Sequence, residues 1–157
     1  MRAKLLAPSI AVLVLAVTGC GSSSSSASSS HAGSSAAKAV GPLRIYRVAL
    51  TGTAETSPGA PSGTGAAVIA FHGSSVVCGR FAHLHGFTNA TVAHIDIGVR
   101  GKSGNSVVAL STGPRLHHQG CVPVSAKLVK TIEDHPRGYY VNIHSTTYPG
   151  GAVRGQL

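Results

Sequence analysis

Glycine and proline interrupt this sequence so often that they constrain its fold more than any other feature. The chain of 157 residues contains 20 glycines and 8 prolines, and between them lie short runs of alternating apolar and polar residues. Alternation with a period of two is typical of strands that bury one face, and so many turn residues argue against a helical bundle. The sequence therefore predicts an all-β fold.

The alternating runs give the number of elements. The expected strands cover Leu43–Thr51, Gly65–Phe71, Ser75–His83, Thr91–Ile97, Ser106–Ser111, Cys121–Val124, Tyr139–Ser145 and Ala152–Leu157. One short helix is expected between them, capped by the hydroxyl of Ser125 and ending near Asp134. Together these elements predict a Greek-key β-sandwich or barrel of about 7–8 short strands with one short helix.

The N-terminus has the features of an export signal. Arg2 and Lys4 precede an apolar run over residues 5–17, which is too short to cross a bilayer. The run ends in Val17-Thr18-Gly19-Cys20, which resembles a bacterial lipobox, the signal at which a cysteine is acylated and becomes the mature N-terminus. We therefore expect a lipoprotein signal peptide over residues 1–19 and a lipidated Cys20; an ordinary cleaved signal peptide is the alternative.

The chain after Cys20 changes composition abruptly. Small residues, mostly serine, cannot bury enough apolar area to offset the entropy of ordering the backbone. Residues 20–42 are therefore expected to form a flexible tether, and residues 43–157 a single folded β-domain. This organisation places the domain outside the cytoplasm, anchored to the membrane of a bacterial cell envelope.

Two cysteines remain once Cys20 is assigned to lipid. Cys78 and Cys121 lie in the exported domain, where paired cysteines most often form disulfides. We expect a Cys78–Cys121 disulfide; two free buried thiols or a metal site are the alternatives.

Charge and motifs narrow the classes of function. Lys and Arg number 13 against 4 acidic residues, and the acidic residues are too scattered for a glycosidase-like carboxylate pair. Neither a Gly-x-Ser-x-Gly elbow nor a phosphate-binding glycine loop occurs, so no enzyme class is indicated. The basic residues lack interleaved aromatics, and nucleic acid is not an expected partner. Anionic lipid headgroups, acidic envelope polymers or an unknown protein fit an exported basic surface better.

The C-terminal segment carries a family resemblance. Residues 140–157 read Tyr-Val-Asn-Ile-His-Ser-Thr-Thr-Tyr-Pro-Gly-Gly-Ala-Val-Arg-Gly-Gln-Leu, which resembles the ending of the CHRD domain, with Ala152 where that family has glutamate. Residues 50–55, 62–70, 92–97 and 107–110 resemble earlier family segments in order, with Asp96 replacing a histidine. The resemblance implies a binding or scaffold module without an assigned reaction, so neither catalytic residues nor a cofactor are expected.

A structural role for this ending follows from its residues. Proline followed by two glycines provides a fixed φ and then the freedom that a tight turn requires. Asn142 and Arg154 can hydrogen-bond neighbouring loops. The motif residues expected to act structurally are Asn142, His144, Pro149, Gly150, Gly151, Arg154, Gly155 and Gln156.

The nine histidines support an alternative hypothesis. His94, Asp96 and His144 on two strands are candidate ligands for zinc or copper, in an arrangement that distantly resembles the copper site of copper/zinc superoxide dismutases. His94 and Asp96 share a face with Val92, which predicts that they point into the core. A buried Asp96 needs a partner, and we expect an arginine (Arg154 or Arg100) or backbone amides to supply it in preference to a metal.

The other histidines are expected on the surface. His83, His85, His117 and His118 lie at a strand end or in a loop, although alternation places His83 on the same face as Val77, Gly79 and Phe81.

Overall fold

One antiparallel sheet of eight strands makes up most of the folded domain. The computed structural model describes residues 42–157, so the predicted signal peptide, most of the predicted tether and Cys20 lie outside the described residues. The strands are β1 (Leu43–Thr51), β2 (Thr64–His72), β3 (Val76–His85), β4 (Ala90–Ile97), β5 (Ser106–Ser111), β6 (Gln119–Pro123), β7 (Tyr139–Ser145) and β8 (Val153–Gln156). The helices are α1 (Ala126–Asp134) and two short 3₁₀ turns, η1 (Gly52–Ala54) and η2 (Pro136–Gly138).

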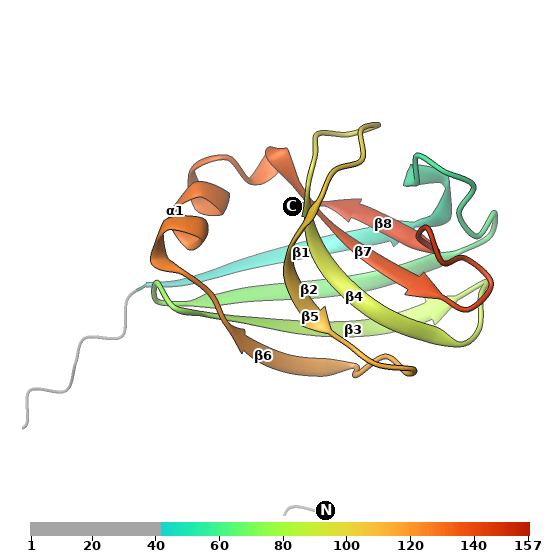
Figure 1. The fold of residues 1–157 in the computed structure, drawn as a ribbon, viewed down its shortest axis with the longest axis horizontal. Coiled ribbons are helices and arrows are strands. Elements are labelled where there is room, and N and C mark those ends of the chain that lie inside the picture. The colour runs from blue at the N-terminus through green and yellow to red at the C-terminus, as the bar shows by residue number, and fades with distance from the viewer. Residues whose placement is uncertain (1–41) are drawn as a thin grey trace, which may run out of the picture. The chain divides into compact units, whose positions relative to one another are not determined.

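The sheet curls into a nearly closed barrel. Its strand order is β5-β4-β7-β8-β1-β2-β3-β6, and the edge strands β5 and β6 approach each other. Figure 1 shows β4, β5, β7 and β8 as one wall of the barrel in front of β1, β2 and β3. The predicted all-β fold with one helix is confirmed, and its strands form a single rolled sheet.

Alternation along each strand fills the barrel with apolar side chains. Positions on the inner side of the sheet are buried, and they include Leu50, Ile69, Phe71, Val77, Ile95, Val141, Ile143 and Val153. Helix α1 adds Val129 and Ile132 to the same core, at the end of the barrel where β1 begins (Figure 1). The side chain of Ser125 accepts a hydrogen bond from the Leu128 N–H at 3.2 Å, so the predicted N-cap is confirmed.

One face assignment on β3 was wrong. The β2–β3 pairing passes from Ala66↔Ala82 to Thr64↔His85, so β3 contains one extra residue and forms a bulge. His83 adopts a φ of 53° at this bulge and is exposed, while Leu84 packs against the core. Because a bulge reverses the alternation beyond it, His83 does not share the face of Val77 and Phe81.

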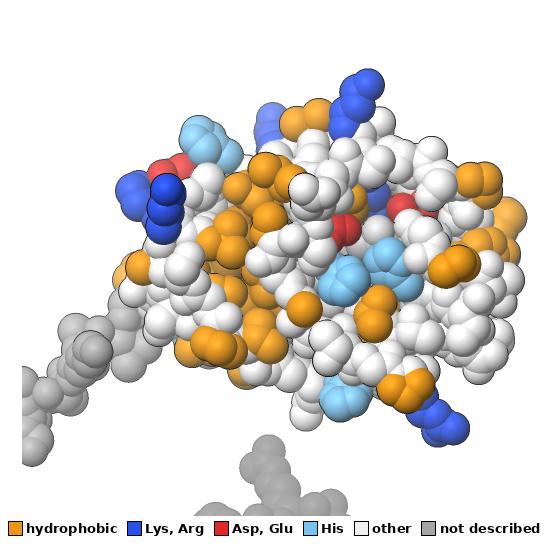
Figure 2. Space-filling model, viewed as in Figure 1, with side chains coloured by type: hydrophobic (Ala, Val, Ile, Leu, Met, Phe, Trp, Pro, Cys, Tyr) orange, Lys and Arg blue, Asp and Glu red, His pale blue; other side chains and the backbone are white. Residues whose placement is uncertain are grey.

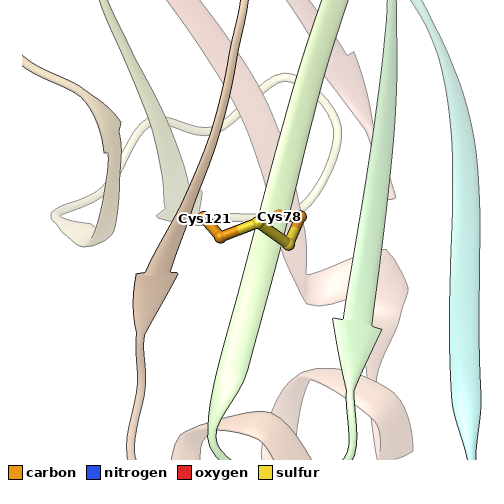
Figure 3. Close-up of a disulfide and its surroundings, with 2 residues drawn as sticks. All are labelled: Cys78 and Cys121. Atoms are coloured by element: carbon orange, nitrogen blue, oxygen red, sulfur yellow. A yellow bond between two sulfur atoms is a disulfide. The ribbon is translucent and has the colours of Figure 1, made fainter.

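A disulfide holds the edge strand β6 against β3. Cys78 and Cys121 are directly opposed in the β3–β6 register, with their Cα atoms 3.9 Å apart, and their sulfurs are bonded (Figure 3). The predicted Cys78–Cys121 pair is confirmed. Neither α1 nor the 3₁₀ turns have the length and apolar character that a membrane crossing requires, and this holds for all helices within residues 42–157.

Candidate functional site

The outer side of β4, β7 and β8 carries polar residues instead of an apolar layer. Ala93, Ile95 and Val141 point into the barrel, and the residues between them point away from it. The register places these outward residues side by side, because Asn142 pairs with both His94 and Arg154, and Tyr140 pairs with both Asp96 and Gln156. We call these six residues, with His144 of β7 and Glu55, the polar cluster: Glu55, His94, Asp96, Tyr140, Asn142, His144, Arg154 and Gln156.

The predicted orientation of His94 and Asp96 was wrong. Both lie on the outer side of β4, opposite Ala93 and Ile95, whose side chains fill the core. Asp96 is nevertheless only 5% exposed. Figure 2 shows histidine and acidic side chains gathered near the middle of the face that it displays. The sequence pattern identified a buried carboxylate but placed it on the wrong side of the sheet.

Arg154 connects the sheet to the loop between β4 and β5. Its side chain is 2% exposed, its Nη2 group donates to the carbonyl oxygen of Val99 at 3.0 Å, and its guanidinium carbon lies 3.3 Å from the centroid of the Tyr140 ring. The loop is also held by the Gly104 N–H, which donates to the Tyr140 hydroxyl at 3.4 Å. The predicted hydrogen bond from Arg154 to a neighbouring loop is therefore confirmed.

The side-chain amide of Gln156 hydrogen-bonds two separate segments of the chain. Its Nε2 atom lies 2.8 Å from the carbonyl oxygen of Gly98, 2.9 Å from that of Arg137 and 2.7 Å from that of Tyr139. Gly98 begins the β4–β5 loop, and Arg137 belongs to η2. One amide on the last strand thus joins both segments to the barrel.

The two histidines of the cluster are neighbours. The ring centroids of His94 and His144 are 5.2 Å apart. The Nδ1 atom of His144 lies 2.8 Å from the carbonyl oxygen of Pro149, which assigns the ring proton to Nδ1 and leaves Nε2 as an acceptor. Burial lowers the pKa of His94, while the Asp96 carboxylate raises it and His144 lowers it further. The net lowering favours a neutral His94 ring at neutral pH.

Glu55 enters the cluster from the segment that follows β1. Burial raises the pKa of Glu55 to about 7, against the attraction of Arg154 and with the repulsion of Asp96. A Cβ atom at Gly151 would lie 2.7 Å from the Glu55 carboxyl carbon, and Gly151 has a φ of +132°. The second glycine of the Pro-Gly-Gly turn therefore serves two needs, the turn conformation and the space that this carboxyl occupies.

Several buried atoms of the cluster make no hydrogen bond within the protein. They are Oε1 of Glu55, Oδ1 of Asp96, Oδ1 of Asn142, Nε2 of His144 and Nη1 of Arg154. Buried polar atoms are nearly always paired, so five in one cluster give it capacity for a polar ligand. Beside the cluster, a hollow of about 220 Å³ is lined by residues that include Thr51, Arg100, Arg154 and Gln156.

The expected arginine partner of Asp96 is not found. Within residues 42–157, the ion pair that forms is Lys130–Asp134 on the exposed side of α1, with 2.8 Å between Nζ and Oδ2. Arg154 lies over Tyr140 instead of bonding Asp96, and Oδ1 of Asp96 bonds neither an arginine nor the backbone amides that were the other expected partners. Among the described residues, no group of three or more His, Cys, Asp and Glu side chains is arranged to hold a metal ion. His94 and His144 do lie together, as the metal hypothesis required.

Four predicted surface residues and two residues that the sequence analysis missed remain to be placed. His83, His85, His117 and His118 are all exposed, as expected for surface histidines. Glu55 and Tyr140 were missed as members of a site, although both occur in segments that carried the family resemblance. The alternation of β7 could have identified Tyr140, but Glu55 reaches the cluster through a loop whose path the sequence does not predict.

Comparison with known proteins gives one match. The model of the CHRD domain family matches residues 46–157, which is more than half of the chain and includes every residue of the polar cluster. No curated protein and no solved structure matches the chain.

Proposed function

The chain belongs to the CHRD domain family, and from this premise we propose that it is a lipid-anchored extracytoplasmic module that binds a partner and catalyses no reaction. The family resemblance supports binding or scaffolding, and the lipobox-like residues before Cys20 support anchoring. The partner is an unknown protein or an anionic envelope polymer, and nucleic acid plays no part.

The observation that supports the binding role is that side chains of the C-terminal family motif hold neighbouring loops in place. Arg154 and Gln156 donate to backbone carbonyls of the β4–β5 loop and η2. Such bonds hold loops in one conformation, and pre-organised loops bind with a smaller loss of conformational entropy. The exposed side chains of Arg100 and Lys102 project from the loop that is held in this way.

Crosslinking in cells tests the binding role. A photoreactive residue at Arg100 should give a discrete crosslinked product, and the same residue at Thr112, in the exposed loop after β5, is the matched control. Adding Gln156→Ala should weaken the crosslink at position 100, because the loop loses its fastening. Equal crosslinking from positions 100 and 112, or none from either, would contradict a binding role for this loop.

Replacing the acylated cysteine tests the anchor. Cys20→Ala should abolish incorporation of labelled palmitate and leave an unprocessed precursor, whereas Ser22→Ala, in the same segment, should leave labelling and processing unchanged. Normal cleavage and release of the Cys20→Ala protein would refute the anchor and favour an ordinary signal peptide.

A metal-binding domain is the second candidate function. The contact between His94 and His144, with the buried Nε2 of His144 and Oδ1 of Asp96 lacking protein partners, favours it. Titration calorimetry with zinc and with copper on tag-free protein decides between the two functions. Submicromolar one-to-one binding that His144→Ala abolishes and His118→Ala leaves intact would establish the metal function.

A further inference from the structure

The outer side of β1, β2, β3 and β6 is apolar, although apolar residues also fill its inner side. The register aligns the outward residues in rows: Ile45, Ala70, Cys78 and Cys121 form one row, and Leu43, His72, Val76 and Pro123 form the next. We call this surface the apolar face, and it consists of Leu43, Ile45, Val68, Ala70, Val76, Cys78, Cys121 and Pro123.

This face is open to solvent. Leu43 is 54% exposed and Ile45 is 49% exposed, which makes them two of the four exposed large apolar side chains among the described residues. The disulfide lies along a hollow of about 390 Å³ whose lining includes Val68, Ala70, Arg80 and Gln119. Strands with one buried face normally present polar residues outward, and a contiguous exposed apolar surface marks an interaction site.

The charge on this face has one sign. Arg47 and Arg80 are the two outward residues that flank Val68 in the register of β1, β2 and β3. None of the outward positions of these strands is acidic: the remaining ones are Ala49, Thr51, Thr64, Ala66, His72, Ala82, His85 and Gln119. Apolar side chains combined with unpaired basic ones complement an anionic lipid surface, because the former enter the interface and the latter attract headgroups.

The chain outside the structure leads directly to this face. Residues 1–41 precede β1, and Leu43, the first residue of β1, is itself part of the apolar face. The segment from Cys20 to Leu43 can span at most about 80 Å when fully extended. A lipid at Cys20 would therefore keep the face within reach of the membrane and make a weak second contact effectively intramolecular.

We propose that the apolar face of β1, β2, β3 and β6 lies against the anionic lipid surface to which the chain is anchored. This proposal rests on the proposed acylation of Cys20. It gives the domain a fixed orientation, with the membrane on the apolar face and the polar cluster, on β4, β7 and β8, facing away from the lipid.

The second exposed apolar pair provides a control. Ile97 is 45% exposed and Val99 is 55% exposed, close to the values for Ile45 and Leu43. They lie at the end of β4 and in the β4–β5 loop, and Val99 shares a hollow with Arg137 and with an acidic residue, Asp134. Exposure is thus matched between the two pairs, and the surroundings differ.

Site-directed fluorescence tests the orientation. With Cys20 acylated and Cys78 bonded to Cys121, no free thiol remains, so Ile45→Cys and Ile97→Cys each create a single labelling position. The labelled lipoproteins are reconstituted into vesicles of phosphatidylcholine and phosphatidylglycerol. Nitroxide-bearing lipids then report contact with lipid, and iodide reports contact with water.

The label at position 45 should be quenched by the nitroxide lipids about two-fold or more strongly than the label at position 97, and should be shielded from iodide. The difference should shrink in vesicles of phosphatidylcholine alone and in the Arg47→Glu/Arg80→Glu variant, but not in an Arg100→Glu variant. Equal nitroxide quenching at both positions would overturn the proposal. Shielding from iodide without nitroxide quenching would mean that a protein, such as a second copy, covers the face, and would also overturn it.

Failure of the anchor is distinguishable from failure of the orientation. If Cys20 is not acylated, the protein without an introduced cysteine does not sediment with the vesicles, and it takes up label at position 20 wherever that cysteine is retained. If the anchor holds and only the orientation is wrong, the protein sediments and takes up no label, but positions 45 and 97 give the same quenching.

Discussion

The polar cluster and the apolar face lie on the outside of the same barrel, yet they are held by different means. In the polar cluster, Arg154 and Gln156 of β8 donate to loop carbonyls, and Tyr140 of β7 accepts from the Gly104 N–H, so that these bonds hold the loops over the sheet. On the apolar face Leu43 and Ile45 are about half exposed, and a disulfide joins β3 to the edge strand β6. Side chains of the polar cluster hydrogen-bond loops of the same protein, whereas those of the apolar face remain exposed for contact with a partner.

Removal of the disulfide is expected to have the largest effect on stability. Cys78→Ser/Cys121→Ser removes a crosslink between positions 43 residues apart. In the chain-entropy model, such a crosslink contributes about 4 kcal/mol to the free energy of unfolding. Urea unfolding of the variant and the wild-type protein, each with and without reductant, measures this difference. Reductant should destabilise only the wild-type protein, and a loss below about 1 kcal/mol would mean that hydrogen bonds alone hold β6.

Arg154→Ala should be the most damaging single change in the polar cluster, at about 3 kcal/mol. It removes the bond to Val99, the contact with Tyr140 and a positive charge that attracts the Glu55 carboxylate. Arg80→Ala is the matched control, because this arginine is exposed on the apolar side of the barrel, and it should cost no more than about 0.5 kcal/mol. Similar losses in both variants would show that the two surfaces contribute alike to the fold.

Much of this architecture could be predicted from the sequence, because it depends on local patterns. Alternation gave the strands, Ser125 gave the start of α1, and the two spare cysteines gave the disulfide. The outward direction of His94 and Asp96 could not be predicted, because both sides of β4 carry residues that become buried. Deciding between them requires knowing which loops cover the outer side.

Two further features depend on contacts distant in sequence. The bulge at His83 depends on pairing between β2 and β3, and beyond it Leu84 takes the core-facing position that strict alternation from Phe81 would give to His83. Glu55 follows β1 in a segment that otherwise looks like a turn, and it reaches Gly151 only after the chain has closed the barrel. The apolar face had no signature either, because its rows combine residues from four strands.

The polar cluster also differs from the apolar face in containing a buried carboxyl group, that of Glu55, whose titration should make the stability of the protein depend on pH. The pKa of Glu55 is about 7 in the folded protein and ordinarily 4.5, as in an unfolded chain, so the folded protein binds more protons than the unfolded one between these pH values. Stability should therefore fall as pH rises from 4.5 to 7, by roughly 1 kcal/mol after allowance for solvent screening. His94, whose pKa is lowered, acts in the opposite direction below pH 6.5, so the comparison is made between the wild-type protein and Glu55→Gln. Parallel pH profiles of the two proteins would contradict the burial of Glu55.

Leu43→Thr/Ile45→Thr should have the smallest effect on stability. Both side chains are about half exposed at the start of β1, and threonine has a β-branched side chain that suits a strand, so the unfolding free energy should change by no more than about 0.5 kcal/mol. Ile97→Thr, at the end of β4, is the matched control. Urea unfolding gives the unfolding free energy of both variants and of the wild-type protein. A loss above about 1 kcal/mol would show that the apolar side chains support the barrel itself, and their exposure would then need no partner. Unchanged stability would show that the two side chains have no role in folding. An exposed apolar surface that does not stabilise the fold is then best explained by binding.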